Sequence, residues 1–254
     1  IGGYHAAKLL RYQEIIDRQL LHPAEQNIPK NWNSNQRTQY LVQMKNSNVL
    51  RMLNCGWIIT SKNPNNKRSK GKAIGYKQDS LDWMNLGLLP PLGNAWFVSE
   101  VHMVDSAYQE MKSLDTFNPA KTVIVDKKFE DEIKKFNLEL SAEIELIQKE
   151  YKPNHLTYSL KNITSDHLAV FSEIFYEKGW NAYIDGKPAE YYRANYALRA
   201  MTVPAGVHQI AFKFEPSVIQ TGSTISLAST ILFVLIAVGG VLWVFRRQKS
   251  NTSS

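Results

Sequence analysis

The sequence predicts an α+β fold in three parts: a mixed α/β N-terminal unit, an antiparallel β-sandwich, and one C-terminal transmembrane helix. Residues 1–125 alternate helical apolar periodicity with short β-rich runs, whereas from about residue 138 the apolar positions recur at every second residue. Residues 216–245 carry no charged side chain. The first pattern is typical of mixed helices and strands, the second of half-buried strands, and the third of a segment that lies in lipid.

The predicted N-terminal unit, residues 1–125, begins with an amphipathic helix. Residues 6–21 place leucine and isoleucine at helical spacing among charged residues, and Pro23 ends the pattern because proline cannot continue a helix. Asp105 is a predicted N-cap, since its carboxylate can accept a hydrogen bond from the first turn of a helix. The other predicted elements are a helix at 36–53, strands at 56–60, 95–104 and 121–125, and a helix at 105–114.

The predicted β-sandwich, residues 138–220, follows a connecting segment at 126–137. Asp185-Gly186 lies between two runs of β-forming residues, and this dipeptide predicts a tight hairpin because both turn positions favour positive φ. The sequence predicts two hairpins, with strands at 180–184 and 188–192 and at 198–203 and 208–214. Six or seven short strands at this spacing favour an antiparallel sandwich.

Residues 225–245 are the predicted transmembrane helix. Twenty-one residues at 1.5 Å each extend about 31 Å, which matches a hydrocarbon core of roughly 30 Å. The tail at 246–254 contains Arg246, Arg247 and Lys249, and basic residues next to a span favour the cytoplasm. We therefore expect the tail in the cytoplasm and residues 1–220 outside it.

The start of the chain also bears on its organisation. It begins Ile1-Gly2-Gly3, and no signal peptide is visible in the residues that follow. A protein that exports a large N-terminal part needs such a signal. We therefore expect this chain to be the C-terminal piece of a longer membrane protein.

The net charge of +7 comes from two basic stretches rather than from the whole chain. Three basic residues lie in the tail and six lie from Lys62 to Lys77; without these nine, 21 of the 30 basic residues remain against 23 acidic ones. This distribution does not indicate a nucleic-acid partner. The segment 61–72 is rich in asparagine and lysine, which predicts a solvated loop, and contact with anionic lipid or polymer is the alternative.

No residue is predicted to be catalytic or to bind a metal ion, and no cofactor is expected. The six histidines stand apart, with no H-E-x-x-H pair and no cysteine at ligand spacing. Cys55 is the single cysteine, so no internal disulfide can form. The chain lacks the G-x-S-x-G, Walker and G-x-G-x-x-G motifs as well.

The segment Tyr191–Arg199 concentrates aromatic rings, two arginines and an amide between the predicted hairpins. Aromatic faces stack on sugar rings or lie at the headgroup level of a membrane, and arginine can hold a phosphate through two parallel hydrogen bonds. The alternative is that these are ordinary sheet residues, every second one in the core. The candidate residues for contact with a glycan or a lipid headgroup are Trp180, Arg193, Asn195, Tyr196 and Arg199.

Several motifs that follow one another along the chain resemble a known family. They are Gly2-Gly-Tyr-His-Ala-Ala-Lys-Leu9, Met52-Leu-Asn54 before Trp57-Ile-Ile-Thr60, Gly93-Asn-Ala-Trp-Phe-Val98, Gly179-Trp-Asn-Ala-Tyr-Ile-Asp-Gly186 and Arg193-Ala-Asn-Tyr-Ala-Leu-Arg-Ala200. Their number and order resemble the C-terminal part of bacterial YfhO-type polytopic membrane proteins. The resemblance spans nearly the whole chain and includes the terminal span.

The resemblance implies a GT-C-like glycosyltransferase of the bacterial cytoplasmic membrane. Such an enzyme would transfer a sugar from a polyprenyl-phosphate carrier to a cell-surface polymer, of which lipoteichoic acid is the known type in the family. The catalytic carboxylate of GT-C enzymes follows their first span, so none of the present residues corresponds to it. The resemblance thus implies membrane lipid, a polyprenyl-phosphate sugar and a surface polymer as partners.

Two other classes of function remain open from the sequence. The chain could be a non-enzymatic glycan-binding or structural module tethered to the membrane, or a subunit of an envelope assembly or transport complex. The segment that precedes Ile1 separates the first alternative from the enzyme, because many upstream spans favour the enzyme and one signal peptide favours the tethered module.

Overall fold

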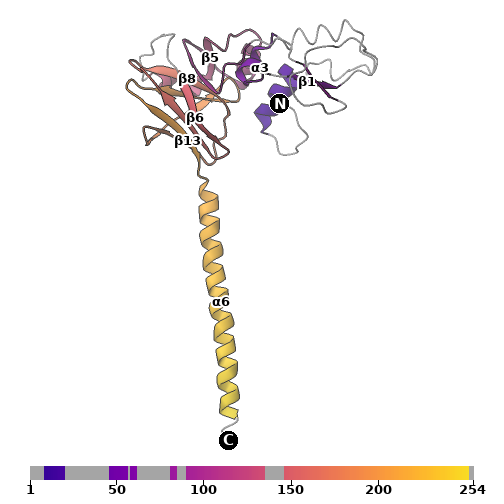
Figure 1. Cartoon of the computed structure of the whole chain (residues 1–254), viewed down its shortest axis with the longest axis vertical. Helices are drawn as coiled ribbons and strands as arrows, with labels where there is room; N and C mark the ends of the chain where they lie inside the picture. Colours follow the sequence, from indigo (N-terminus) through magenta and orange to yellow (C-terminus); the bar gives the residue numbers. More distant parts are fainter. Residues whose placement is uncertain are drawn as a thin grey trace. The chain divides into compact units, whose positions relative to one another are not determined.

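The computed structural model describes residues 9–20, 46–56, 58–61, 81–84, 90–134 and 146–251, and the chain divides into two compact units. The larger unit joins Ile1–Phe175 with Ala182–Phe212 and contains both large sheets. The smaller unit joins Tyr176–Asn181 with Lys213–Ser254 and contains the long C-terminal helix α6. Helices, strands and one long apolar helix confirm the predicted α+β class (Figure 1).

The N-terminal helices are short. Helix α1 (Leu10–Ile15) continues directly into the π-helix η1 (Ile16–Leu20), and both lie within the predicted helix at 6–21. Helix α3 (Asn48–Met52) begins after Ser47, whose hydroxyl accepts a hydrogen bond from the backbone of the first turn. It is the described part of the helix predicted at 36–53. The strands β1 (Ile58–Ser61) and β2 (Leu81–Met84) form a separate antiparallel pair.

A six-stranded sheet forms the centre of the larger unit, in the order β3-β8-β12-β11-β5-β4. Its first three strands in sequence are β3 (Ala95–Val98), β4 (Glu100–Val104) and β5 (Thr122–Asp126), and its later ones are β8 (His167–Ile174), β11 (Tyr192–Ala194) and β12 (Leu198–Val203). The pair β4–β5 is parallel and is connected through helix α4 (Ala107–Ser113), whereas the other described pairings are antiparallel. The sheet therefore takes strands from both predicted units.

Ser99 divides the single strand that was predicted at 95–104. Strand β3 pairs with β8 at one edge of the sheet and β4 pairs with β5 at the other, although one residue separates β3 from β4. Because consecutive Cα atoms are only about 3.8 Å apart, the two edges must meet at Ser99. The sheet consequently curls on itself instead of lying open.

A five-stranded sheet lies against the first one, in the order β10-β9-β13-β7-β6. Its strands are β6 (Leu146–Lys152), β7 (His155–Leu160), β9 (Trp180–Ile184), β10 (Lys187–Ala189) and β13 (Gln209–Phe214). Asp185 and Gly186 connect β9 to β10 with φ of 47° and 80°, which confirms the first predicted hairpin. The second predicted hairpin is wrong: β12 belongs to the six-stranded sheet and β13 to the five-stranded sheet, so residues 204–208 cross between them.

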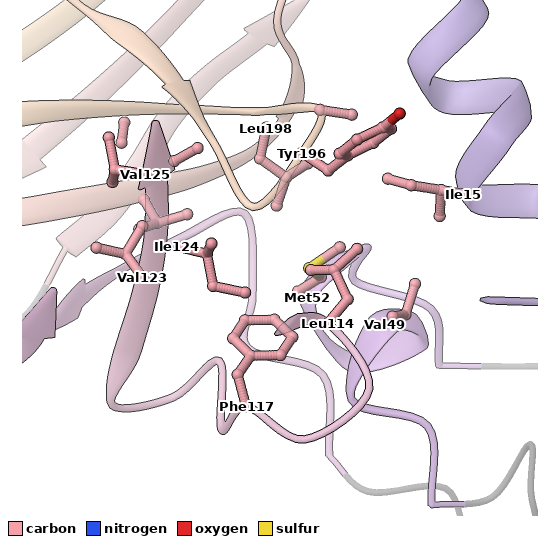
Figure 2. Packing of buried hydrophobic residues seen from close by; sticks show 14 of the residues in the cluster. Ile15, Val49, Met52, Leu114, Phe117, Val123, Ile124, Val125, Tyr196 and Leu198 are labelled. Carbon is pink, nitrogen blue, oxygen red and sulfur yellow. The ribbon is translucent and has the colours of Figure 1, made fainter. Parts of the chain in front are cut away.

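Apolar side chains fill both faces of the six-stranded sheet. On one face the strands pack against the short helices, where Ile15, Met52 and Leu114 are buried and Ile124 of β5 is directed toward them (Figure 2). On the other face the rings of Tyr158, Phe171 and Phe212 pack with centroid distances of 4.9 to 6.3 Å and form an aromatic core between the two sheets. The N-cap of α4 is Ser106 and not the predicted Asp105, whose carboxylate pairs with Lys127 at 2.5 Å.

Helix α6 (Ser217–Asn251) is one continuous helix (Figure 1). Its segment Ser217–Val241 is long and apolar enough to cross a membrane. The predicted span at 225–245 lies inside the helix, but the helix begins earlier, directly after Pro216. Proline before the first turn is compatible with this start, since its fixed φ suits the entry to a helix.

Candidate functional site

The turn between β11 and β12 has an unusual backbone. Asn195 and Tyr196 have φ of 46° and 71°, in the left-handed region that side chains other than glycine adopt at a cost. Two hydrogen bonds to strand β5 offset this cost. The N–H of Asn195 donates to Ile124 O at 2.8 Å, and the Oδ1 of Asn195 accepts from Ile124 N at 2.9 Å. The turn is thereby attached to the buried strand β5.

The same turn belongs to a buried polar cluster, which we call the Glu110 cluster: Arg11, Glu14, Glu110, Arg193 and Tyr196. Glu110 is fully buried on α4, and its Oε2 lies 2.8 Å from Arg11 Nη1 and 4.0 Å from Arg193 Nε. Its Oε1 accepts a hydrogen bond of 2.9 Å from the N–H of Tyr196. The hydroxyl of Tyr196 donates to Glu14 on α1, and the Arg11 guanidinium lies 4.4 Å from the centre of the Tyr196 ring.

The electrostatics of this cluster are dominated by burial. Burial raises the pKa of Glu110, while Arg193, the N–H of Tyr196 and Arg11 act in the opposite direction. Burial and the neighbouring Glu14 carboxylate together raise the pKa of Tyr196 to about 12. Because the carboxylate is bonded to the protein on both oxygens, the cluster attaches α1 to α4 and to the turn. Figure 2 shows Tyr196 directed toward the segment that carries Ile15.

A second polar cluster lies at the aromatic core between the sheets, and we call it the Glu173 cluster: Tyr151, Tyr158, Glu173, Tyr191 and Arg199. Arg199 is 2% exposed, its Nε donates to Ile174 O at 3.2 Å, and its guanidinium lies 5.2 Å from the centre of the Phe212 ring. The carboxyl of Glu173 and burial raise the pKa of Tyr151, and Tyr151 is 64% exposed.

Burial also raises the pKa of Glu173, opposed by Arg199 and by the hydrogen bond from Tyr151. Tyr158 is fully buried, and burial followed by the nearby Glu173 raises the pKa of its hydroxyl. That hydroxyl has no hydrogen-bond partner among the residues that the structure describes. The Glu173 cluster therefore differs from the Glu110 cluster in containing a side chain, Tyr151, that is 64% exposed.

Trp180 lies elsewhere, in the smaller unit, at the joint that leads into α6. Its ring packs on Phe214 with a centroid distance of 5.4 Å, and the N–H of Glu215 donates to Gly179 O at 2.5 Å. Asn181 Nδ2 donates to Glu215 Oε2 at 3.0 Å. Gly179 has φ of 96°, and a Cβ there would lie 2.8 Å from the Phe214 ring, so only glycine fits.

The structure distributes the five predicted contact residues over these three places. Arg193 and Tyr196 lie in the Glu110 cluster, Arg199 in the Glu173 cluster, Asn195 in the turn and Trp180 at the joint. Arg193, Asn195, Tyr196 and Arg199 are buried and have partners within the protein. Their contact with a glycan or a headgroup stays a prediction.

Neither Glu110 nor Glu173 is among the site residues predicted from the sequence. A signal for Glu110 exists, because it shares the apolar helical face of Met111 and Leu114. Glu173 lies in β8 at the point where its pairing with β12 shifts register, so strand alternation gives no signal for it. Over the described residues, no group of three or more histidine, cysteine or acidic side chains could hold a metal ion.

Residues 126–226 match the family model described as bacterial membrane protein YfhO. The matched segment includes β6 to β13, the joint and the first residues of α6. Neither the curated proteins nor the solved structures contain a match to the chain.

Proposed function

We propose that this chain, a YfhO-family membrane protein through its residues 126–226, is the C-terminal module of a GT-C-like membrane glycosyltransferase. The observation that supports the proposal is the family match over the five-stranded sheet, over β8, β11 and β12 of the six-stranded sheet, and over the start of the apolar helix. The full-length enzyme would take a sugar from a polyprenyl-phosphate carrier and attach it to a cell-surface polymer. Its catalytic carboxylate would lie upstream of Ile1, so the chain alone would be inactive.

The proposed topology follows from charge. Arg246, Arg247 and Lys249 would hold the C-terminal end of α6 in the cytoplasm, because basic residues next to a span favour that side. Residues 1–220 would then lie outside the bacterial cytoplasmic membrane, where they could meet a surface polymer.

The proposed role of this extracytoplasmic part is to hold the acceptor or the carrier headgroup above the membrane. Two of the predicted contact residues have surroundings that support it. Trp180 is partly exposed at the joint with α6, and an aromatic ring next to a span suits the headgroup level. Arg199 lies in the cluster that contains the exposed Tyr151.

Sugar transfer by the reconstituted full-length protein tests the proposal. Vesicles that contain the protein are given polyprenyl-phosphate sugars and a surface polymer, and release of polyprenyl phosphate is followed over time. We expect release that depends on the polymer. Glycan binding without release would support the tethered binding module instead, and release only with a co-purified protein would support a subunit of a larger complex.

A further inference from the structure

The joint at the start of α6 consists of two chain segments, Tyr176–Asn181 and residues 213–216, which belong with the helix to one compact unit. Hydrogen bonds connect the two segments. The N–H of Glu215 donates to Gly179 O at 2.5 Å, and Asn181 Nδ2 donates to Glu215 Oε2 at 3.0 Å. The loop Tyr176–Asn181, which is remote from α6 in the sequence, is thereby attached to the residues that lead into the helix.

Close packing at Gly179 sets the distance between this loop and the helix. A Cβ on Gly179 would lie 2.8 Å from the Phe214 ring and 2.9 Å from Cβ of Pro216. Pro216 is the residue directly before the first residue of α6, Ser217. The loop backbone is therefore in contact with the start of the helix, so the loop lies wherever α6 enters a membrane.

Exposed apolar side chains continue from the joint onto the first turn of α6. Tyr176 is 38% exposed, Val218 is 79% exposed and Ile219 is 65% exposed. Trp180 and Phe214, whose rings pack on each other, are partly exposed. Burial of aliphatic groups in a bilayer is favourable, and tyrosine and tryptophan suit the headgroup level because one end of the side chain is apolar and the other polar. This composition is typical of the boundary between lipid and water.

The length of the apolar segment places the joint at the same level. Ser217–Val241 has 25 residues and extends about 37 Å, which is more than the hydrocarbon core of about 30 Å and less than the whole bilayer of about 40–45 Å. Such a segment, centred on the bilayer, begins within the headgroup layer. Trp243 is exposed near the other end, 27 positions after Pro216. That separation is about 40 Å, so the two ends of the span carry one tryptophan level each.

The charges of the joint balance. Glu177 and Lys178 lie in the first segment, and Lys213 and Glu215 lie in the second. Segments that bind anionic lipids do so through an excess of basic residues, which the joint does not have. Contact with lipid at the joint therefore depends on its aromatic side chains and should be as strong with neutral as with anionic phospholipids.

We infer that the joint is a second membrane contact of this chain, in which Tyr176 and Trp180 lie in the phospholipid headgroup layer beside the start of α6. The inference deepens the proposed function and rests on one part of it, the span of α6 across the membrane. Strand β9 begins at Trp180 and β13 ends at Phe214, and these strands are neighbours in the five-stranded sheet. Two paired strands are thus connected directly to the contact.

Tryptophan fluorescence tests the depth of Trp180. The chain is reconstituted in phosphatidylcholine vesicles that contain a lipid with a nitroxide on its headgroup, which quenches nearby tryptophans. We expect lipid quenching to fall by about half in Trp180→Phe, because Trp180 and Trp243 are the two tryptophans expected at headgroup level. The control is Trp96→Phe, since Trp96 is buried in the larger unit and its loss should leave the quenching unchanged.

Two results would overturn the inference. Quenching of the Trp180 emission by aqueous acrylamide but not by the labelled lipid would place the joint in water. The span predicted at 225–245 has this consequence, because it begins eight residues after Ser217 and moves the joint about 12 Å outward. Protection of Trp180 from both quenchers would mean that protein, rather than lipid, covers the joint.

A matched pair of glycine substitutions tests whether packing at Gly179 holds the loop on the bilayer. Gly179 and Gly186 have φ of 96° and 80°, so alanine strains the backbone at either position. An added Cβ meets Phe214 and Pro216 at the first position and nothing within 4 Å at the second. We expect Gly179→Ala to lose most of the lipid quenching of Trp180 and Gly186→Ala to retain it. Equal quenching in the two variants would contradict a contact held by the joint.

Vesicle composition tests the role of charge, and a transfer assay separates this inference from the proposed function. We expect equal quenching of Trp180 in neutral vesicles and in vesicles with phosphatidylglycerol, and a strong preference for the anionic lipid would contradict an aromatic contact. Lipid quenching of Trp180 without sugar transfer by the full-length protein would support the contact and sink the enzyme. Transfer with Trp180 in water would support the enzyme and sink the contact.

Discussion

The two buried clusters use similar residues for different purposes. Each contains a glutamate whose pKa burial raises and an arginine that opposes the rise. The carboxylate of Glu110 is bonded on both oxygens by groups of the protein, from α1 and from the turn before β12. Glu173 is only partly buried, and the exposed Tyr151 is one of the groups that lower the pKa of its carboxyl.

The difference teaches how to recognise a structural polar cluster. A buried charge costs several kcal/mol unless partners satisfy it, so a carboxylate with all its partners inside the protein is best explained by the contacts it joins. The Glu110 cluster thus explains how α1 is attached to α4 and to the turn before β12.

Removing the carboxylate of the Glu110 cluster gives the largest expected effect. Glu110→Ala leaves Arg193 with Asp126 at 3.8 Å, but it removes the partner of Arg11 and of the Tyr196 N–H. We expect a loss of about 3 kcal/mol in the free energy of unfolding, measured by denaturant titration of the detergent-purified chain.

The control for this substitution is Asp131→Ala, at an exposed position in α5 (Glu130–Lys134). We expect this control to change the free energy of unfolding by less than about 0.5 kcal/mol. A loss below about 1 kcal/mol for Glu110→Ala would mean that the Glu110 cluster does not hold the turn and α1 together, and the comparison with Glu173 would fail.

A matched pair of hydroxyl deletions should change stability in opposite directions. Tyr196→Phe removes a hydrogen bond to Glu14, so we expect a loss of about 1 kcal/mol. Tyr158→Phe removes a hydroxyl without a partner among the described residues, so we expect a gain of about 1 kcal/mol. Thermal unfolding of both variants under one condition measures the difference. Two losses of equal size would show that both hydroxyls are satisfied and would remove the contrast.

The sequence predicts local features of this molecule better than its sheet order. Asp185-Gly186 determines a hairpin by its own backbone preference, and the structure has that hairpin. Pro204 and Gly206 also predict a reversal of the chain, but the residues of a turn do not determine which sheet the next strand joins. Strand β12 pairs with β11 just before it and with β8, whereas β13 lies between β7 and β9 in the other sheet.

The two clusters could not be predicted from the sequence, because their members lie far apart along the chain. Glu110 meets Arg11 and Tyr196, which are 99 and 86 residues away along the chain. The segment around Asn195 was correctly identified as unusual in composition, yet its side chains are buried in the structure. Composition shows that a segment is rich in polar and aromatic groups, whereas burial depends on strand pairing that leaves no local pattern.

The smallest predicted effect is a change in how the free energy of unfolding depends on pH, and it reports directly on the carboxyl of Glu173. Its folded-state pKa is raised, so the folded state holds the proton more tightly than the unfolded state does. The stability from this group is full below the ordinary glutamate pKa of about 4.3, and it is lost as the pH rises through the folded-state value. Glutamine cannot titrate, so the difference in unfolding free energy between Glu173→Gln and the unmodified chain should move in favour of glutamine as the pH rises.

The hydrogen bond from Tyr151 lowers the pKa of Glu173, which supplies the control for this measurement. Tyr151→Phe removes that contribution, so the carboxyl should keep its proton to a higher pH. The gain from Glu173→Gln should then begin at the same pH but continue to a higher pH and become larger in a pH series of thermal unfolding. The two substitutions should therefore be non-additive at neutral pH. Parallel pH profiles for the unmodified chain and Glu173→Gln would place this carboxyl in water, and the exposed Tyr151 would then have no connection to the buried hydroxyl of Tyr158.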